Sequence, residues 1–129
     1  MKIRTDFVTN SSSVSYIITM QEDVVDYFIK QYEGSERLAS DIRIASWLRQ
    51  FIKENGEKNY IDKHEVYTCL MQFRTDNDCM SNEAYEEQGE EADPKKMSEK
   101  ELLDYVRGEY ICGGKLSTIT GGFGATRVE

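Results

Sequence analysis

Few residues in this chain have types and spacings that support catalysis. The only histidine, His64, lies in a run of charged residues from Asp62 to Glu65. General acid–base chemistry usually relies on a group that titrates near neutral pH, and a hydrolase triad would need His64 to serve a serine. The sequence has no GxSxG motif, which holds such a serine in α/β-hydrolases. We therefore predict that His64 is a surface residue, assign no catalytic residue, and favour a non-enzymatic protein.

The cysteines do not indicate a disulfide framework or a zinc site. Cys69, Cys79 and Cys112 are odd in number, and no two of them have CxxC spacing. This pattern disfavours both a disulfide scaffold and a four-thiolate metal centre. We expect reduced thiols with a structural or incidental role, because a buried cysteine packs like a small apolar residue.

Acidic residues are concentrated in one segment, 76–104, which holds eleven acids and three lysines. The rest of the chain carries thirteen residues of each sign, so this segment accounts for the whole net charge of −8. A negative field repels nucleic-acid phosphates and attracts basic protein surfaces. We expect a basic protein partner and no direct nucleic-acid binding. The candidate binding residues are Glu83, Glu86, Glu87, Glu90, Glu91 and Asp93.

The same acidic segment does not fit a known metal loop. Asp76-x-Asp78 begins like a calcium-binding EF-hand, but that pattern needs an oxygen ligand and then a glycine where this chain has Met80 and Ser81. A solvated acidic face is the simpler interpretation. We predict no metal ion and no cofactor.

A polar run near the N-terminus is the second candidate site. Serine, threonine and asparagine side chains bond readily to local backbone and form turns that accept anions, and two basic residues lie close by in the sequence. Three interpretations stay open: a polar loop that leads into a strand, an appended recognition signal, or a phosphate or nucleotide pocket. The residues concerned are Arg4, Phe7, Thr9, Asn10, Ser11, Ser12 and Ser13.

The first eighteen residues carry a specific pattern, in which Lys2 and Arg4 precede Phe7-Val-Thr-Asn-Ser-Ser-Ser and Tyr16 follows. This pattern resembles the N-termini of a scattered group of small proteins from Firmicutes and their phages. The chain departs from it by placing Val14 inside the serine run. The resemblance implies no established activity. It favours the recognition-signal interpretation and implies an accessory or anti-defence protein of a phage or mobile element.

Composition indicates one α+β domain over residues 1–129, because the length and the aromatic and aliphatic content support a single core. No apolar run approaches the roughly twenty residues that cross a bilayer. Hydroxyl side chains stand where a signal peptide would be apolar, so we expect a cytoplasmic protein without a membrane segment.

The first half of the chain predicts a strand and two helices. Residues 14–19 are β-branched and aromatic with no polar face, which is typical of a short central strand. Residues 22–32 follow a capping-box pattern at Thr19 and predict a helix. A second helix, starting near Ser35 and ending at Asn55-Gly56, has an apolar stripe. The stripe consists of Leu38, Ile42, Ala45, Leu48 and Ile52, widened by Ile44, Trp47 and Phe51.

The second half predicts less regular structure. Residues 60–75 fit both a strand and a helix, with β-branched and aromatic content favouring a strand. Residues 76–97 read as an exposed acidic connection with a turn of helix near 83–87, and 98–111 as a capped helix. The Gly-rich residues 113–129 predict either a hairpin, pairing 115–120 with 125–129, or a loose tail.

Two hypotheses follow from these observations. The first is a non-enzymatic, acidic interaction protein that binds a basic partner. The second is a small ligand-binding, nucleotide-binding or enzymatic α/β domain that uses the loop Thr9–Ser13. The first explains the regional charge, whereas the second depends on a loop of unspecific residues.

Overall fold

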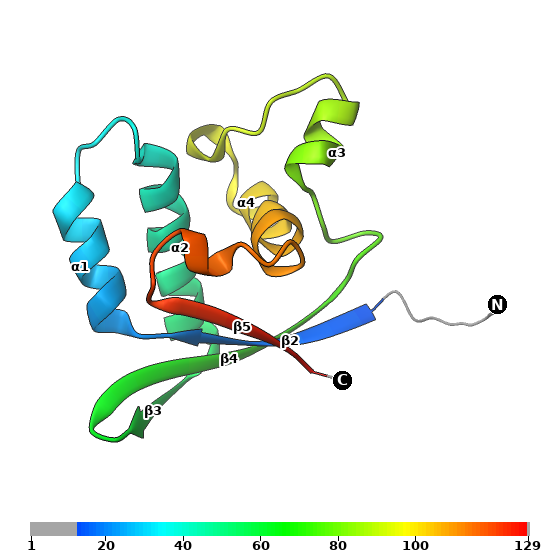
Figure 1. Cartoon of the computed structure of the whole chain (residues 1–129). Coiled ribbons are helices and arrows are strands. Elements are labelled where there is room, and N and C mark those ends of the chain that lie inside the picture. The colour runs from blue at the N-terminus through cyan, green and yellow to red at the C-terminus, as the bar shows by residue number, and fades with distance from the viewer. Residues whose placement is uncertain (1–12, 129) are drawn as a thin grey trace.

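Residues 13–128, which the computed structural model describes, form an antiparallel sheet of four strands with helices packed on one face (Figure 1). The strand order is β3-β4-β2-β5, in which β2 (Ser13–Met20) lies between β4 (His64–Arg74) and β5 (Phe123–Val128), and β3 (Glu57–Ile61) forms the outer edge. The predicted α+β class and the central position of the first predicted strand are both confirmed.

The sheet has one covered face and one open face. Alternate side chains of β2 and β4, such as Ile18 and Cys69, point into the core beneath the helices. Their neighbours Ile17 and Leu70 are 41% and 67% exposed and pair across the open face. The ambiguous residues 60–75 therefore form a strand for most of their length, with the alternating burial that a half-covered sheet requires.

Two long helices cover one end of the sheet. The helix α1 (Glu22–Tyr32) has the predicted bounds, but Thr19 does not cap it, because β2 continues to Met20 and Gln21 takes the capping position. The helix α2 (Ala39–Asn55) begins four residues after Ser35, whose Oγ accepts a hydrogen bond from the Leu38 backbone N–H at 3.4 Å.

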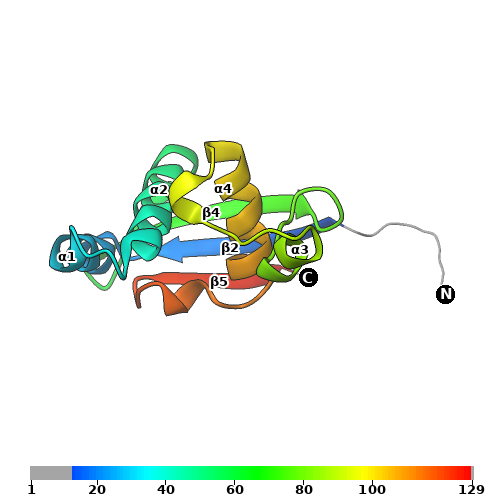
Figure 2. The ribbon, with the colours of Figure 1, turned by 90° about the horizontal axis from the view of Figure 1, so that it is seen from above.

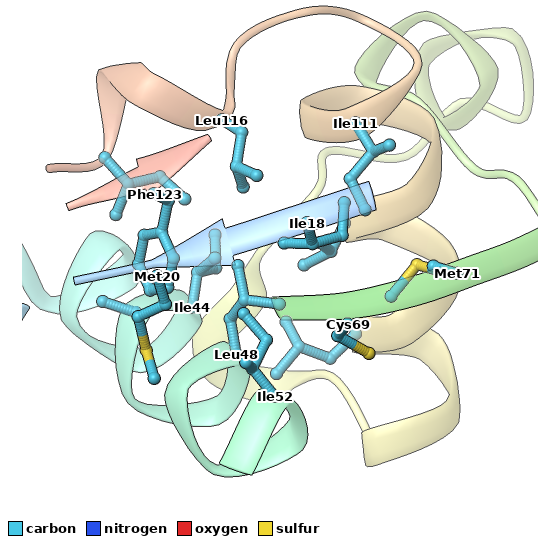
Figure 3. Close-up of a cluster of buried hydrophobic side chains, with 14 of the residues drawn as sticks. Ile18, Met20, Ile44, Leu48, Ile52, Cys69, Met71, Ile111, Leu116 and Phe123 are labelled. Atoms are coloured by element: carbon cyan, nitrogen blue, oxygen red, sulfur yellow. The ribbon is translucent and has the colours of Figure 1, made fainter. Parts of the chain in front are cut away.

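The predicted stripe of α2 lies against the sheet. Four of its side chains are fully buried, and the partly buried Trp47 and Phe51 widen it as expected. Figure 3 shows how this stripe meets the side chains of β2, β4 and β5. The four fully buried residues of the α2 stripe are Ile44, Ala45, Leu48 and Ile52.

The acidic segment, residues 76–104, follows β4 along the chain. It contains α3 (Asn82–Glu87), which matches the predicted turn of helix, and a 3-10 turn, η1 (Pro94–Lys96). The helix α4 (Glu99–Tyr105) starts with the predicted capping box between Ser98 and Glu101. It continues to Ile111 as a π-helical segment, η2 (Val106–Ile111). Figures 1 and 2 both place α1 at one end of the sheet and α3 at the other.

Both alternatives predicted for the C-terminal residues, a hairpin and a loose tail, are wrong. Residues Leu116–Thr118 form a 3-10 turn, η3, that buries Leu116, while β5 pairs with β2 rather than with residues 115–120. The intervening glycines allow close packing instead of a tight turn. A Cβ on Gly122 would lie 2.8 Å from Val25 Cγ2, and one on Gly124 would lie 2.9 Å from Thr19 Oγ1. The burial of Leu116 and the pairing of β5 with the free edge of β2 are together more favourable than a local hairpin would be.

Candidate functional site

The N-terminal motif lies mostly outside the residues that the structure describes. Of its predicted site residues, Arg4, Phe7 and Thr9–Ser12 fall outside, and Ser13 is the exposed first residue of β2. The function assigned to this loop therefore stays a prediction. The acidic candidates all fall within the described part of the chain.

The predicted acidic residues are arranged by α3 and the turn after it. Ser81 caps the helix by accepting a hydrogen bond from the Ala84 N–H at 3.2 Å. Gly89, with φ of +75°, ends it, and the Glu90 N–H then donates to the Tyr85 carbonyl at 2.9 Å. A left-handed glycine is a common helix terminator. Reversing the chain there brings Glu90 back toward the helix that carries Glu86.

These glutamates form one wall of a hollow that we call the acidic cavity. It has a volume of about 570 Å³, and it lies between α3, the start of α2 and the junction of α4 with η2. Three of the six predicted binding residues line it, together with two tyrosines from α4 and η2. The lining residues are Ser40, Asn82, Glu86, Glu90, Glu91, Ala92, Pro94, Tyr105 and Tyr110.

The two tyrosines of the acidic cavity are held rigidly. The rings of Tyr105 and Tyr110 meet edge to face with centroids 5.8 Å apart, and Tyr85 packs against Tyr105 in the same way at 5.9 Å. The Tyr105 hydroxyl donates to Asn82 Oδ1 at 2.6 Å. Burial raises the pKa of both Tyr105 and Tyr110, so both remain neutral phenols near pH 7.

A buried carboxylate, Glu109, fastens α3 to η2. Glu109 is only 7% exposed, its Oε1 accepts a hydrogen bond from the Asn82 N–H at 3.0 Å, and its Oε2 pairs with Lys115 Nζ. Burial alone would raise the pKa of Glu109, but the hydrogen bonds from Lys115 and Asn82 outweigh it and lower that pKa. Glu109 is therefore an ionised structural anchor that holds Asn82, a lining residue of the acidic cavity.

Gly108 completes this attachment. A Cβ at Gly108 would lie 2.6 Å from the Met80 backbone nitrogen, so the loop before α3 rests directly on the η2 backbone. The Met80 N–H also donates to the Asp104 carbonyl at 3.0 Å. Backbone contacts this close are open only to glycine, and they fix the position of α3 relative to the tyrosines.

The other acidic candidates lie around this cavity in different ways. Glu83 lines a neighbouring hollow of about 490 Å³ beside Glu109 and Lys115. Asp93 lines a third hollow, of about 460 Å³, and caps η1 by accepting from the Lys95 N–H at 3.2 Å. Glu87 is exposed on α3 and lines none of these three hollows. The six predicted binding residues therefore differ in position. Three line the acidic cavity, Glu83 lines a neighbouring hollow, Asp93 caps η1, and Glu87 is exposed on α3.

Most acids in the rest of the 76–104 segment already have partners. Asp76 pairs with Arg74, Asp104 pairs with Lys100 and Arg107, and Glu101 belongs to the capping box. Within residues 13–128, by contrast, the structure shows no ion pair for the three glutamates of the acidic cavity. Their charge is available to an external partner.

Other sequence candidates take structural or surface positions. His64 is exposed at the start of β4, beside the turn at Asp62 and Lys63, and is a surface residue as predicted. Trp47, which widens the predicted apolar stripe, stacks on Phe51 with ring centroids 5.3 Å apart, beside a hollow of about 270 Å³ between α2 and α4. No three His, Cys, Asp or Glu side chains within residues 13–128 converge as a metal site.

Sequence reasoning identified the glutamates of the acidic cavity but not its tyrosines or Glu109. Tyr105 and Tyr110 lie in the predicted capped helix 98–111, where large aromatic residues are expected to pack in the core. Glu109 had a detectable signal, because it follows Leu102 and Val106 on the apolar stripe of that helix. A carboxylate at such a position usually has a buried partner.

None of the helices within the described residues is long and apolar enough to cross a membrane. Comparisons of the chain with protein-family models, with curated proteins and with solved structures find no match in any of the three.

Proposed function

We propose that this chain is a non-enzymatic interaction protein that binds a basic surface of a partner protein through the acidic cavity. The observation that carries the proposal is the position of Glu86, Glu90 and Glu91. They carry no ion pair within the described residues and line the same hollow as the buried Tyr105 and the partly buried Tyr110. The negative region of the chain therefore includes a defined hollow and is more than a diffuse charged surface.

This combination suits an arginine or lysine side chain of the partner. Carboxylates give charge-assisted hydrogen bonds to a guanidinium or ammonium group, and tyrosine ring faces attract cations within about 6 Å. Tyr105 and Tyr110 are fixed by their mutual contact and by Asn82. A preorganised wall of this kind loses little side-chain entropy when a partner binds.

The N-terminal resemblance extends the proposal to a biological setting. Proteins with similar N-termini occur in Firmicutes and their phages, so we propose an accessory or anti-defence protein of a phage or mobile element, acting in the bacterial cytoplasm. A basic, nucleic-acid-binding protein of the host is one class of target that the negative charge would attract.

The proposal can be tested with an arginine-rich peptide as the probe for the acidic cavity. The variant replaces Glu86, Glu90 and Glu91 with Gln, which removes three charges at nearly constant volume. We expect its dissociation constant for the peptide to rise about tenfold or more, because a tenfold change corresponds to about 1.4 kcal/mol. Isothermal titration calorimetry with the full chain would measure the affinity, and circular dichroism would verify folding.

A matched control distinguishes binding at the acidic cavity from a general effect of the net charge. Replacing Glu33, Glu54 and Glu57 with Gln also removes three negative charges, from exposed positions outside the acidic cavity. We expect this control to bind within about twofold of the original chain, as exposed charges at a distance are screened by salt. Equal losses in both variants, or no loss in either, would contradict binding at the cavity.

Capture from a bacterial lysate would then identify the partner. The original chain and the cavity variant serve as paired baits, with and without nuclease treatment. The proposal expects one stoichiometric basic protein that survives the nuclease and is lost from the variant. A prey that disappears with nuclease would instead indicate nucleic acid as the bridge.

A further inference from the structure

Two of the three cysteines lie against each other where the loop before α3 meets the end of η2. After burial, the neighbouring Cys112 thiol is the main cause that raises the pKa of the Cys79 thiol, and it also raises the pKa of the Tyr16 hydroxyl of β2, so the three groups lie close together. Cys112 is exposed and Cys79 is partly buried, so one thiol of the pair is open to reagents in solution. The third, Cys69, is buried in the sheet and lies outside this pair.

The backbone around the pair holds it in place. Met80, next to Cys79, rests on Gly108, which precedes Cys112 by about one helical turn. The link from the Asn82 N–H to Glu109 lies three residues from each cysteine and joins the same two segments. The thiols are therefore brought together by a packed junction and not by a chance contact of surface side chains.

We infer that Cys79 and Cys112 are a redox-modification site, at which a low-molecular-weight disulfide such as glutathione disulfide converts the two thiols into one reversible intramolecular disulfide. The pair is independent of the proposed binding function, because neither cysteine lines the acidic cavity. Reversible disulfides of this kind in a reducing compartment are typically regulatory.

The reaction proceeds in two exchange steps. The exposed Cys112, as a thiolate, attacks one sulfur of glutathione disulfide and forms a mixed disulfide, and the first glutathione leaves as a thiolate that takes up a proton. Cys79 then loses its proton to water and attacks the Cys112 sulfur, which expels the second glutathione. The two protein thiols have lost two electrons and two protons, and one glutathione disulfide has become two glutathione molecules.

The electrostatics of the pair support this order. Burial, followed by the charge and hydrogen bonding of Cys112, raises the pKa of Cys79 to about 12, so Cys79 is protonated and slow to react in the reduced protein. A mixed disulfide on Cys112 has no thiol proton or thiolate charge. Two causes of the raised pKa of Cys79 then disappear, which favours the second step only after the first.

The test equilibrates the full chain with mixtures of reduced and oxidised glutathione, alkylates the remaining thiols and maps them by peptide mass spectrometry. We expect a monomer that has lost two hydrogen atoms, with Cys79 joined to Cys112 and Cys69 alkylated. The oxidised form should unfold several degrees higher, and dithiothreitol should reverse the shift, since a cross-link restricts the unfolded chain. Retention of three free thiols in excess oxidised glutathione, or a bond that includes Cys69, would overturn the inference.

Substituting one cysteine at a time tests whether Cys112 reacts first and Cys79 second. Cys79→Ser should accumulate a glutathione adduct on Cys112, whereas Cys112→Ser should leave Cys79 largely unmodified. Equal labelling of the two variants would contradict the assigned order. A short bis-thiol reagent such as dibromobimane, applied to the original chain, tests the proximity of the thiols without any substitution. Failure of that reagent to bridge Cys79 and Cys112 would overturn the inference.

Discussion

Glu109 shows how one buried side chain can position a surface site. Its carboxylate reaches the Asn82 N–H at the start of α3 and Lys115 beyond η2, so it joins three segments that are separated along the chain. Removing the charge of Glu109 should weaken the attachment of α3 to η2, while the glutamates of the acidic cavity themselves stay unchanged. Glu109→Gln keeps the shape and one acceptor oxygen but loses the ion pair. We expect a loss of about 1–2 kcal/mol in the free energy of unfolding, measured by urea denaturation.

The matched control for this substitution is Glu99→Gln, an exposed change in the first turn of α4, which should stay within about 0.5 kcal/mol of the original chain. An equal effect of the two variants would show that Glu109 anchors nothing.

The charge of Glu109 also gives stability a pH dependence. Its pKa is lowered in the folded protein from an ordinary value of 4.5, so the folded state binds that proton less readily than the unfolded state does. The stabilisation is complete above about pH 4.5 and is lost as the pH falls through the lower folded pKa. Denaturation curves between pH 7 and pH 3 should therefore converge for the original chain and Glu109→Gln. A constant difference across that range would exclude the carboxylate as its source.

Gly108 is a second residue whose role depends on one contact. Alanine is the better helix former by about 1 kcal/mol, so propensity alone predicts that Gly108→Ala stabilises the protein. The new methyl group would lie 2.6 Å from the Met80 nitrogen, however, and the contact involves rigid backbone. We expect a net loss of about 1–3 kcal/mol by chemical denaturation. Gly121→Ala, which meets nothing within 4 Å, is the control and should be nearly neutral.

Among the elements, α2 supplies the stripe that closes the core over β2 and β4. Leu48 lies at its centre and is fully buried, so Leu48→Ala should cost about 2–5 kcal/mol, partly through the cavity that it leaves. Ser46 is exposed on the opposite face of the same helix, and Ser46→Ala should change stability by less than about 0.5 kcal/mol. A loss of only a few tenths of a kcal/mol for Leu48→Ala would show that Leu48 does not pack in the core.

The elements also show what could be read from the sequence. Periodicity acts within a few residues of chain and predicts α1 and α2 correctly, and the Ser98 capping box also forms as predicted. The capping residues expected at Thr19 and Ser35 are not the N-caps of these two helices. The C-terminal strand has its partner in β2, about one hundred residues earlier, and no local signal encodes such a pairing. The same limit applies to the acidic cavity, where local charge predicts the glutamates, but the tyrosines join them only in the folded chain, where α3, the start of α2 and the junction of α4 with η2 meet.

For the whole molecule, the uneven charge predicts how binding responds to salt. If the acidic cavity steers a basic partner, association of the original chain should be fast at low salt and should slow as ionic strength rises, because exposed charges are screened beyond about 8–10 Å near physiological salt. Replacing Glu86, Glu90 and Glu91 with Gln should reduce both the rate and its salt dependence. Stopped-flow fluorescence at two salt concentrations would measure this, and identical rates at low salt would remove the cavity from the encounter.

The place of β5 in the sheet has a consequence for how the protein is made. β2 can pair with β4 once residue 74 has been synthesised, but its other edge waits for β5, roughly fifty residues later. At a synthesis rate of about 5–20 residues per second, that edge stays unpaired for about 3–10 s. During this time β2 presents free N–H and C=O groups beside exposed Ile17, the combination through which nascent strands aggregate. Chaperones that cover the nascent chain should therefore raise its soluble yield, whereas slower chain elongation should lower that yield by lengthening the exposure of this edge.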